Sequence, residues 1–211
     1  RIGMAKIHKF QDDITEEVAN SLKESIGIDV EATGLQIPER DKLSLIQICD
    51  QNGVVYIIQP DRKNYKAPNL VKVLEDASIL KIGHYLRFDK SALEFFLKCK
   101  IKSIFDTKIA SKVVRTYTDQ HGLKSLVYEF CNKNLDKRSS SSDWNKDINE
   151  LSDKQLEYAA NDVIFLHKIK NELEKMLKRE NRMDLYKNCI TFLDTRIKLD
   201  QSGFKFDVFE H

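Results

Sequence analysis

The chain has 211 residues, 41% hydrophobic and 32% charged, with only seven glycines and three prolines, and this composition excludes a disordered or low-complexity protein. Its 35 basic and 33 acidic residues leave a net charge of +2, so charge alone gives no reason to expect a nucleic-acid partner. The four cysteines form no Cys-x-x-Cys pair, and no apolar run reaches the roughly 20 residues of a membrane helix. We therefore expect buried free thiols and a cytoplasmic protein with no membrane partner.

Short runs rich in β-branched residues predict strands in the first half of the chain. These runs cover Ser25–Val30, Leu43–Ile48, Val54–Ile58 and Ile79–Ile82. Asn52–Gly53 stands between the second and the third run, where a hairpin turn is expected.

Apolar residues at helical intervals predict helices over residues 88–99 and 123–130, and a last amphipathic helix over residues 185–199. Strands that come first and then alternate with helices are typical of a layered α/β domain. The chain contains no internal repeat.

Two acidic residues share one face of the first predicted strand. Side chains alternate along a strand, so Asp29 and Glu31 lie on one face while Ile28 and Val30 lie on the other. Two carboxylates so placed repel each other and destabilise the fold unless cations bind them. An exposed edge strand is the alternative, and it would be favoured if this pair stood alone.

A third acid follows the strand that ends at Gly83. Asp89 is expected in the first turn of the next helix, at the end of the sheet where α/β proteins place ligands. The alternative is that Asp89 only complements the helix dipole.

One long helix is predicted over residues 151–177, opened by a capping box of Ser152 and Gln155. It carries Tyr158 and Asp162, which are four residues apart and therefore point the same way. Taken alone, this tyrosine is more typical of a core residue and this aspartate of a solvated helix face.

The conjunction of these signals predicts a metal site with four carboxylates and one phenol. Magnesium prefers oxygen ligands, and two ions roughly 3.5–4 Å apart can stabilise the attacking and the leaving oxygens of a phosphodiester. In this hypothesis Asp29 bridges both ions, Glu31 and Asp162 complete the first, and Asp89 holds the second, directly or through water. A tyrosine hydroxyl is neutral near neutral pH, so Tyr158 is expected to orient the attacking water.

These residues resemble a known family. Asp29-x-Glu31, Asp89 and Tyr158-x-x-x-Asp162 are similar to the three exonuclease motifs of the DEDD superfamily, tyrosine branch, and the segment 142–162 is similar to ribonuclease D. The resemblance implies a ribonuclease H-like fold, a mixed β-sheet flanked by helices with a helical C-terminal segment. It also implies two Mg²⁺ or Mn²⁺ ions per active site, and removal of nucleoside 5′-monophosphates from the 3′ end of single-stranded RNA.

The same resemblance implies substrate contacts around the acidic residues. Leu35 is expected as an apolar wedge beside the terminal base, and His84, Tyr85 and Phe88 as further contacts to the terminal nucleotide. Stacking of this kind suits sequence-tolerant binding of a single strand. Core packing is the alternative for these apolar and aromatic residues, and it is favoured for Phe88.

A polar segment, Lys133–Lys146, is predicted to be a functional or mobile loop and not a domain linker. Ser139–Ser142 stand where relatives often carry glutamine, which leaves a substrate role of this loop open. The alternative favoured for Lys137 and Arg138 is a solvated charge pair, and for Trp144 a packing anchor.

We expect a single 3′→5′ exonuclease domain over residues 1–211, with a core over about 26–178, a C-terminal helix over about 182–200 and no additional helical RNA-binding domain. Two other functions are considered: an exonuclease that acts on single-stranded DNA, and a non-catalytic nucleic-acid-binding module. The presence of all five site residues argues against the module. The sequence makes no prediction of the oligomeric state.

Overall fold

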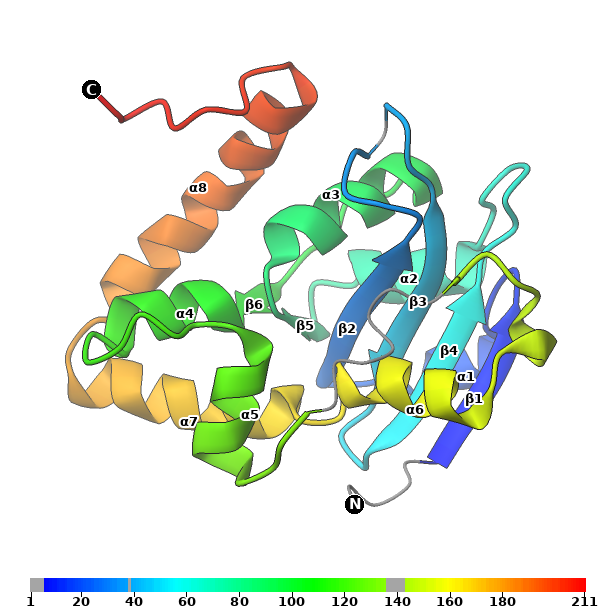
Figure 1. The fold of residues 1–211 in the computed structure, drawn as a ribbon, viewed down its shortest axis with the longest axis horizontal. Coiled ribbons are helices and arrows are strands. Elements are labelled where there is room, and N and C mark those ends of the chain that lie inside the picture. The colour runs from blue at the N-terminus through cyan, green and yellow to red at the C-terminus, as the bar shows by residue number, and fades with distance from the viewer. Residues whose placement is uncertain (1–5, 38, 136–142) are drawn as a thin grey trace.

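A six-stranded sheet with helices on both faces forms the centre of the computed structural model, which describes residues 6–37, 39–135 and 143–211 (Figure 1). In chain order the elements are β1 (Lys6–Gln11), α1 (Glu16–Ser21), β2 (Ser25–Ala32), β3 (Leu43–Cys49), β4 (Val54–Gln59), α2 (Pro68–Glu75), β5 (Leu80–Gly83), α3 (Leu86–Leu97), β6 (Ile104–Asp106), α4 (Thr107–Val114), α5 (Leu123–Cys131), η1 (Ile148–Glu150), α6 (Asp153–Asn161), α7 (Leu166–Arg179) and α8 (Met183–Gln201). The predictions for Lys137, Arg138 and Ser139–Ser142 lie outside the described residues.

The sheet is mixed, as the resemblance implied. Its strands lie in the order β1-β4-β3-β2-β5-β6, with β3 antiparallel to both neighbours and all other pairs parallel. The predicted hairpin between β3 and β4 is confirmed, and Gly53 supplies its positive φ of 84°. β5 pairs only with Ser25–Gly27 of β2, so Asp29 and Glu31 lie beyond that pairing. Both residues are nevertheless half-buried, so the alternative of a solvent-exposed strand is wrong.

Alternation along the strands divides the hydrophobic core between the two faces of the sheet. Ile26, Ile28 and Val30 of β2 join the core under α1, α2, α3 and α8. Leu45 of β3 and Ile82 of β5 join the core under α4 to α7. Asp29 and Glu31 therefore point toward this second face. Among the described helices, none combines the length and the apolar character needed to cross a membrane.

The prediction of one helix over residues 151–177 is wrong, because the helix is interrupted by a turn at residues 162–165. The amides of Val163 and Ile164 both donate to the Ala160 carbonyl at 3.1 Å, which tightens the chain and ends α6. The turn packs against Gly27 of β2, where an added Cβ would lie 3.0 Å from Val163 O and 3.2 Å from a Leu166 methyl. Tertiary packing thus overrides the continuous helical pattern. The capping box that opens α6 is confirmed.

The other predicted elements are confirmed with shifts of a few residues, but the sequence patterns did not reveal β1, α1, α2, β6, α4 and η1. All four cysteines are free. Cys49 is buried and Cys99 and Cys131 are half-buried, whereas Cys189 is exposed, so the prediction of a buried thiol is wrong for Cys189.

We expect the Gly27→Ala variant to be less stable than the wild type by about 1–3 kcal/mol, because the added methyl group overpacks the contact with Val163 and Leu166. Thermal unfolding followed by circular dichroism would show a melting temperature several degrees lower. Gly122→Ala is the matched control, since its added methyl group meets no atom within 4 Å. Equal effects of the two substitutions would contradict the packing argument.

Candidate active site

A cleft of about 730 Å³ brings together all of the predicted site residues. Its walls come from β2 and the loop after it, the start of α3, the start of α4, and α6. The predicted residues that line it are Asp29, Glu31, Leu35, His84, Tyr85, Phe88, Asp89, Tyr158 and Asp162.

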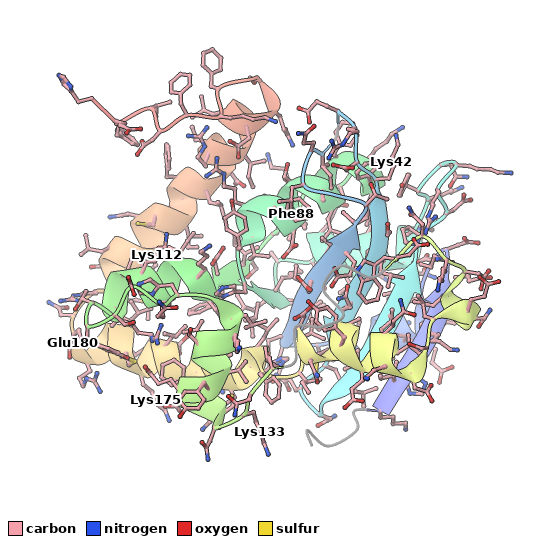
Figure 2. The ribbon with its side chains drawn as sticks, viewed as in Figure 1. Lys42, Phe88, Lys112, Lys133, Lys175 and Glu180 are labelled. Atoms are coloured by element: carbon pink, nitrogen blue, oxygen red, sulfur yellow. The ribbon has the colours of Figure 1, made fainter. Side chains whose placement is uncertain are left out.

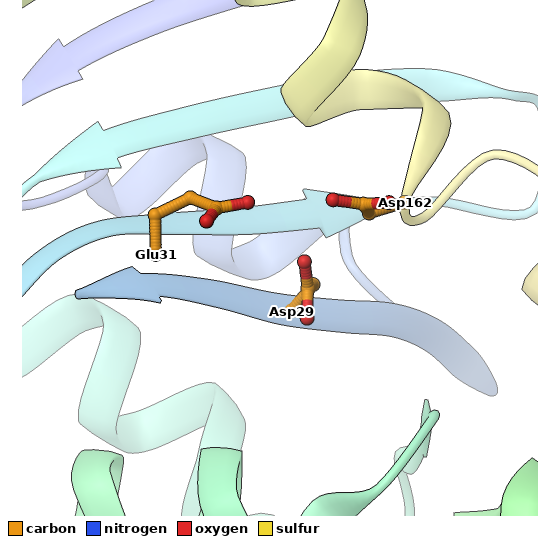
Figure 3. Close-up of side chains that lie close together, drawn as sticks. All are labelled: Asp29, Glu31 and Asp162. Carbon is orange, nitrogen blue, oxygen red and sulfur yellow. The ribbon is translucent and has the colours of Figure 1, made fainter. Parts of the chain in front are cut away.

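Three of the acids form a compact cluster. Figure 3 shows Asp29 and Glu31 on β2 and Asp162 at the end of α6, where it caps the C-terminus of the helix. One carboxylate oxygen from each lies within 4.8 Å of the other two. This spacing suits three ligands of one divalent cation, and oxygen is the ligand atom that Mg²⁺ and Mn²⁺ prefer.

Asp89 lies beside this cluster, in the first turn of α3 as predicted. Its charge is close enough to raise the pKa of Asp29, and the residue is only 3% exposed. Among the described residues, Asp89 Oδ2 has no hydrogen-bond partner although it is buried. A buried carboxylate oxygen without a donor is costly, and a cation is the group that would satisfy it.

The four acids influence one another's protonation. The pKa of Asp29 is raised well above its ordinary value by burial and by the charges of Asp89, Asp162 and Glu31. The pKa of Asp89 is likewise raised, by burial and then by the charges of Glu31, Asp106 and Asp162. Without a cation, negative charge on this cluster therefore opposes folding.

Gln47 is a site residue that the sequence analysis missed. It is fully buried on β3, directly opposite Asp29 in the register. Its Nε2 lies 3.3 Å from Asp29 Oδ2, 3.3 Å from Glu31 Oε1 and 3.2 Å from Ala159 O, so the amide donates to both acids and to α6. An amide within a mostly apolar strand was the available signal, but its meaning depends on the register between β2 and β3.

Tyr158 lies one turn before Asp162 on α6, and both residues line the cleft. The Trp144 ring stacks on the Tyr158 ring, with centroids 6.0 Å apart and an interplanar angle of 24°. Trp144 is buried, which confirms that it is a packing anchor, and it also lines the cleft. Arg62 holds this segment by donating to Asn145 O at 2.9 Å and to Trp144 O at 3.2 Å.

The expected substrate contacts differ in how exposed they are. Leu35 is 82% exposed and Tyr85 43% exposed, so core packing is wrong for both. Phe88, on α3 (Figure 2), packs against the first core and also lines the cleft. The hydroxyl of Thr107 donates to Gly83 O at 3.1 Å and lies 2.9 Å from His84 Nδ1, so the His84 ring is hydrogen-bonded to the start of α4.

A buried carboxylate, Asp41, makes hydrogen bonds within the loop that carries Leu35. Asp41 accepts a hydrogen bond from the Gln36 amide at 2.9 Å. The side chain of Arg40 and the Gln36 amide lower the pKa of Asp41, so it remains a charged acceptor. A Cβ at position 34 would lie 2.5 Å from Asp41 Oδ2, and glycine is therefore required at that position.

Comparison with known proteins gives three clear similarities. A family model described as 3′–5′ exonuclease matches residues 5–178. DNA polymerase I of Aquifex aeolicus is 34% identical over 71% of this chain and 24% of its own length. Ribonuclease D of Gluconacetobacter diazotrophicus is 30% identical over 68% of this chain and 35% of its own length. The chain thus spans only about a quarter to a third of these two relatives.

Among solved structures, NrnC of Brucella melitensis is 41% identical and matches with a TM-score of 0.90 over 98% of each chain. Two further structures of that protein hold bound Mg²⁺ and bound pGG, with TM-scores of 0.89 and 0.91. These matches confirm the nuclease fold and the resemblance to ribonuclease D. The chain belongs to the 3′–5′ exonuclease family.

Proposed function

We propose that this protein is a 3′→5′ exoribonuclease that removes nucleotides one at a time from the 3′ end of single-stranded RNA and releases nucleoside 5′-monophosphates. The observation that carries this proposal is the convergence of four carboxylates and Tyr158 in one cleft. A non-catalytic binding module would have no need for a cluster whose charges oppose folding.

The proposal includes two Mg²⁺ or Mn²⁺ ions per active site. Asp29, Glu31 and Asp162 supply the ligands of one site, and Asp89 with Asp29 would serve the other. The bound Mg²⁺ of the NrnC structure supports a divalent ion, and the unpartnered Asp89 oxygen supports a second ligand position. When bound, two such ions would activate water and neutralise charge on the scissile phosphate.

The protein's own residues would position the reactants. Tyr158 offers a phenol next to Asp162, where it can hydrogen-bond the attacking water, and Trp144 fixes the plane of its ring. Leu35 and Tyr85 present exposed apolar surface in the same cleft for the terminal bases. Such stacking reads no sequence, as an exonuclease requires.

RNA is favoured as the substrate because the relatives include ribonuclease D and because NrnC is bound to pGG in its structure. Single-stranded DNA is the second candidate, since DNA polymerase I of Aquifex aeolicus shares 34% identity with this chain. The single-domain organisation and the cytoplasmic location stay predictions.

We expect 5′-labelled single-stranded RNA to give a ladder of one-nucleotide steps with Mg²⁺ and no ladder with EDTA. Asp29→Ala and Asp162→Asn should each reduce the rate by roughly 10³-fold or more, because each removes a metal ligand. Asp184→Asn, an exposed position on α8, is the matched control. A ladder on DNA alone would favour the second candidate, and full activity in either site variant would refute the assignment of the acids.

Mg²⁺ should stabilise the protein more at neutral than at acidic pH. Since burial and neighbouring charges raise the pKa values of Asp29 and Asp89, the folded metal-free protein binds more protons there than the unfolded chain. The stability of the metal-free protein therefore falls as the pH rises from the ordinary aspartate pKa of 3.8, which applies to the unfolded chain, through the raised pKa values of the folded protein. The loss of stability persists at neutral pH. Saturating Mg²⁺, at about 100 times its Kd, should restore about 2.7 kcal/mol.

Asp29→Asn separates this effect from general salt stabilisation. The variant should melt at a higher temperature than the metal-free wild type, because one repelling charge is gone, and it should lose the response to Mg²⁺. Differential scanning fluorimetry across a pH series measures both quantities. A Mg²⁺ response of equal size in the variant would contradict the proposed site.

Trp144→Leu should lower kcat up to about tenfold and leave KM nearly unchanged, because the stack that orients Tyr158 is worth about 0.5–1.5 kcal/mol. Trp144→Phe retains an aromatic face and should recover most of the rate. Steady-state kinetics on a short RNA would measure kcat and KM separately for each variant. A loss confined to KM would instead place Trp144 in substrate binding.

A further inference from the structure

Lys108 is the single lysine or arginine among the described residues that line the cleft. The same cleft holds four carboxylates, whereas a nucleic-acid strand brings one negative charge with each phosphate. Cations bound by the carboxylates would serve the scissile phosphate. A neighbouring phosphate of the strand needs a positive group of the protein itself.

The ammonium group of Lys108 lies over an aromatic ring. Its Nζ is 4.5 Å from the centroid of the Tyr85 ring. Within the described part of the chain, it forms no ion pair with a carboxylate. An ammonium over an aromatic face still has N–H donors for a further partner. Lys108 is half-buried and Tyr85 is 43% exposed, so both reach the open cleft.

One buried carboxylate fixes both members of this pair. Asp106 Oδ1 accepts from the amides of Lys108 at 2.8 Å and Ile109 at 3.0 Å, at the start of α4. Its Oδ2 accepts from the amide of Leu86 at 2.8 Å, next to Tyr85. Tyr85 itself has a φ of +65°, a strained conformation for a non-glycine residue that persists only where its surroundings hold it. Asp106 therefore fixes the backbone that carries Lys108 and Tyr85, so that the ammonium group lies over the Tyr85 ring before any substrate binds.

We propose that Lys108 binds the substrate phosphate on the 5′ side of the scissile phosphate, with the Tyr85 ring supporting its ammonium group. This inference rests on the proposed exonuclease function and adds a residue that determines substrate binding. In this proposal, two consecutive phosphates of the substrate strand are bound at two different positions in the cleft. The acids hold cations at the scissile phosphate, and Lys108 holds the next phosphate along the strand.

The test compares two RNA tetranucleotides, one unmodified and one with a neutral methylphosphonate at the linkage 5′ to the scissile linkage. Release of the first nucleotide with Mg²⁺ is measured for wild type, Lys108→Met and Lys108→Arg. Lys112→Met is the matched control, because it removes one charge from an exposed position of the same helix, outside the cleft (Figure 2).

We expect Lys108→Met to lower kcat/KM on the unmodified RNA by about tenfold or more, mainly through KM, as for loss of a charged hydrogen bond. The wild type should lose a similar factor on the methylphosphonate RNA, and Lys108→Met should lose little more on it. Lys108→Arg should retain most activity, and Lys112→Met should match the wild type.

Two results would overturn the inference while the proposed function stands. One is an unchanged kcat/KM in Lys108→Met. The other is an equal loss in Lys108→Met on both RNAs, because Lys108 would then act on the structure and not on that phosphate. If the wild type releases no nucleotide from the unmodified RNA, the proposed function fails and takes the inference with it.

Discussion

The contact between Gly27 on β2 and the turn at residues 162–165 determines where the acidic residues meet. Because Gly27 has no Cβ, the Val163 carbonyl and the Leu166 side chain can approach the strand closely. That approach ends α6 at Asn161 and leaves Asp162 as its C-terminal cap, facing Asp29. Two distant parts of the chain thereby supply one ligand set, and the precision of the site depends on a packing contact that involves no charged group.

The cluster that this contact assembles opposes folding in the absence of a cation. Burial and mutual repulsion raise the pKa values of Asp29 and Asp89, and the Gln47 amide offers only two long hydrogen bonds in compensation. A neutral amide can orient carboxylates but cannot cancel their charge. Cation binding and folding are therefore linked: the fold holds the acids close together, and a cation removes the resulting loss of stability.

Local periodicity predicted the placement of most of the site residues but not the contacts between elements, and the prediction for Asp89 rested mainly on the family resemblance. Strand alternation placed Asp29 and Glu31 on one face, and helical pitch kept Tyr158 and Asp162 on one side although the predicted helix was too long. The break after Asn161 has no glycine or proline, and the apolar pattern continues across it, so the local sequence does not predict it, whereas the close contact with Gly27 accounts for it. The role of Gln47 could be recognised only from the register between β2 and β3. The patterns missed β1 because it is a mostly exposed edge strand, and β6 because it has only three residues.

The cleft has to attract divalent cations and also admit a polyanion, and these requirements conflict if they share one position. Asp106 shows how the fold separates them. As a buried acid outside the ligand cluster, it adds negative potential that raises the pKa of Asp89 and so favours cations there. Its oxygens are occupied by backbone amides, which direct the starts of α3 and α4 and place Lys108 over Tyr85. The same carboxylate thus strengthens the cation site and orients the positive group that a phosphate strand requires.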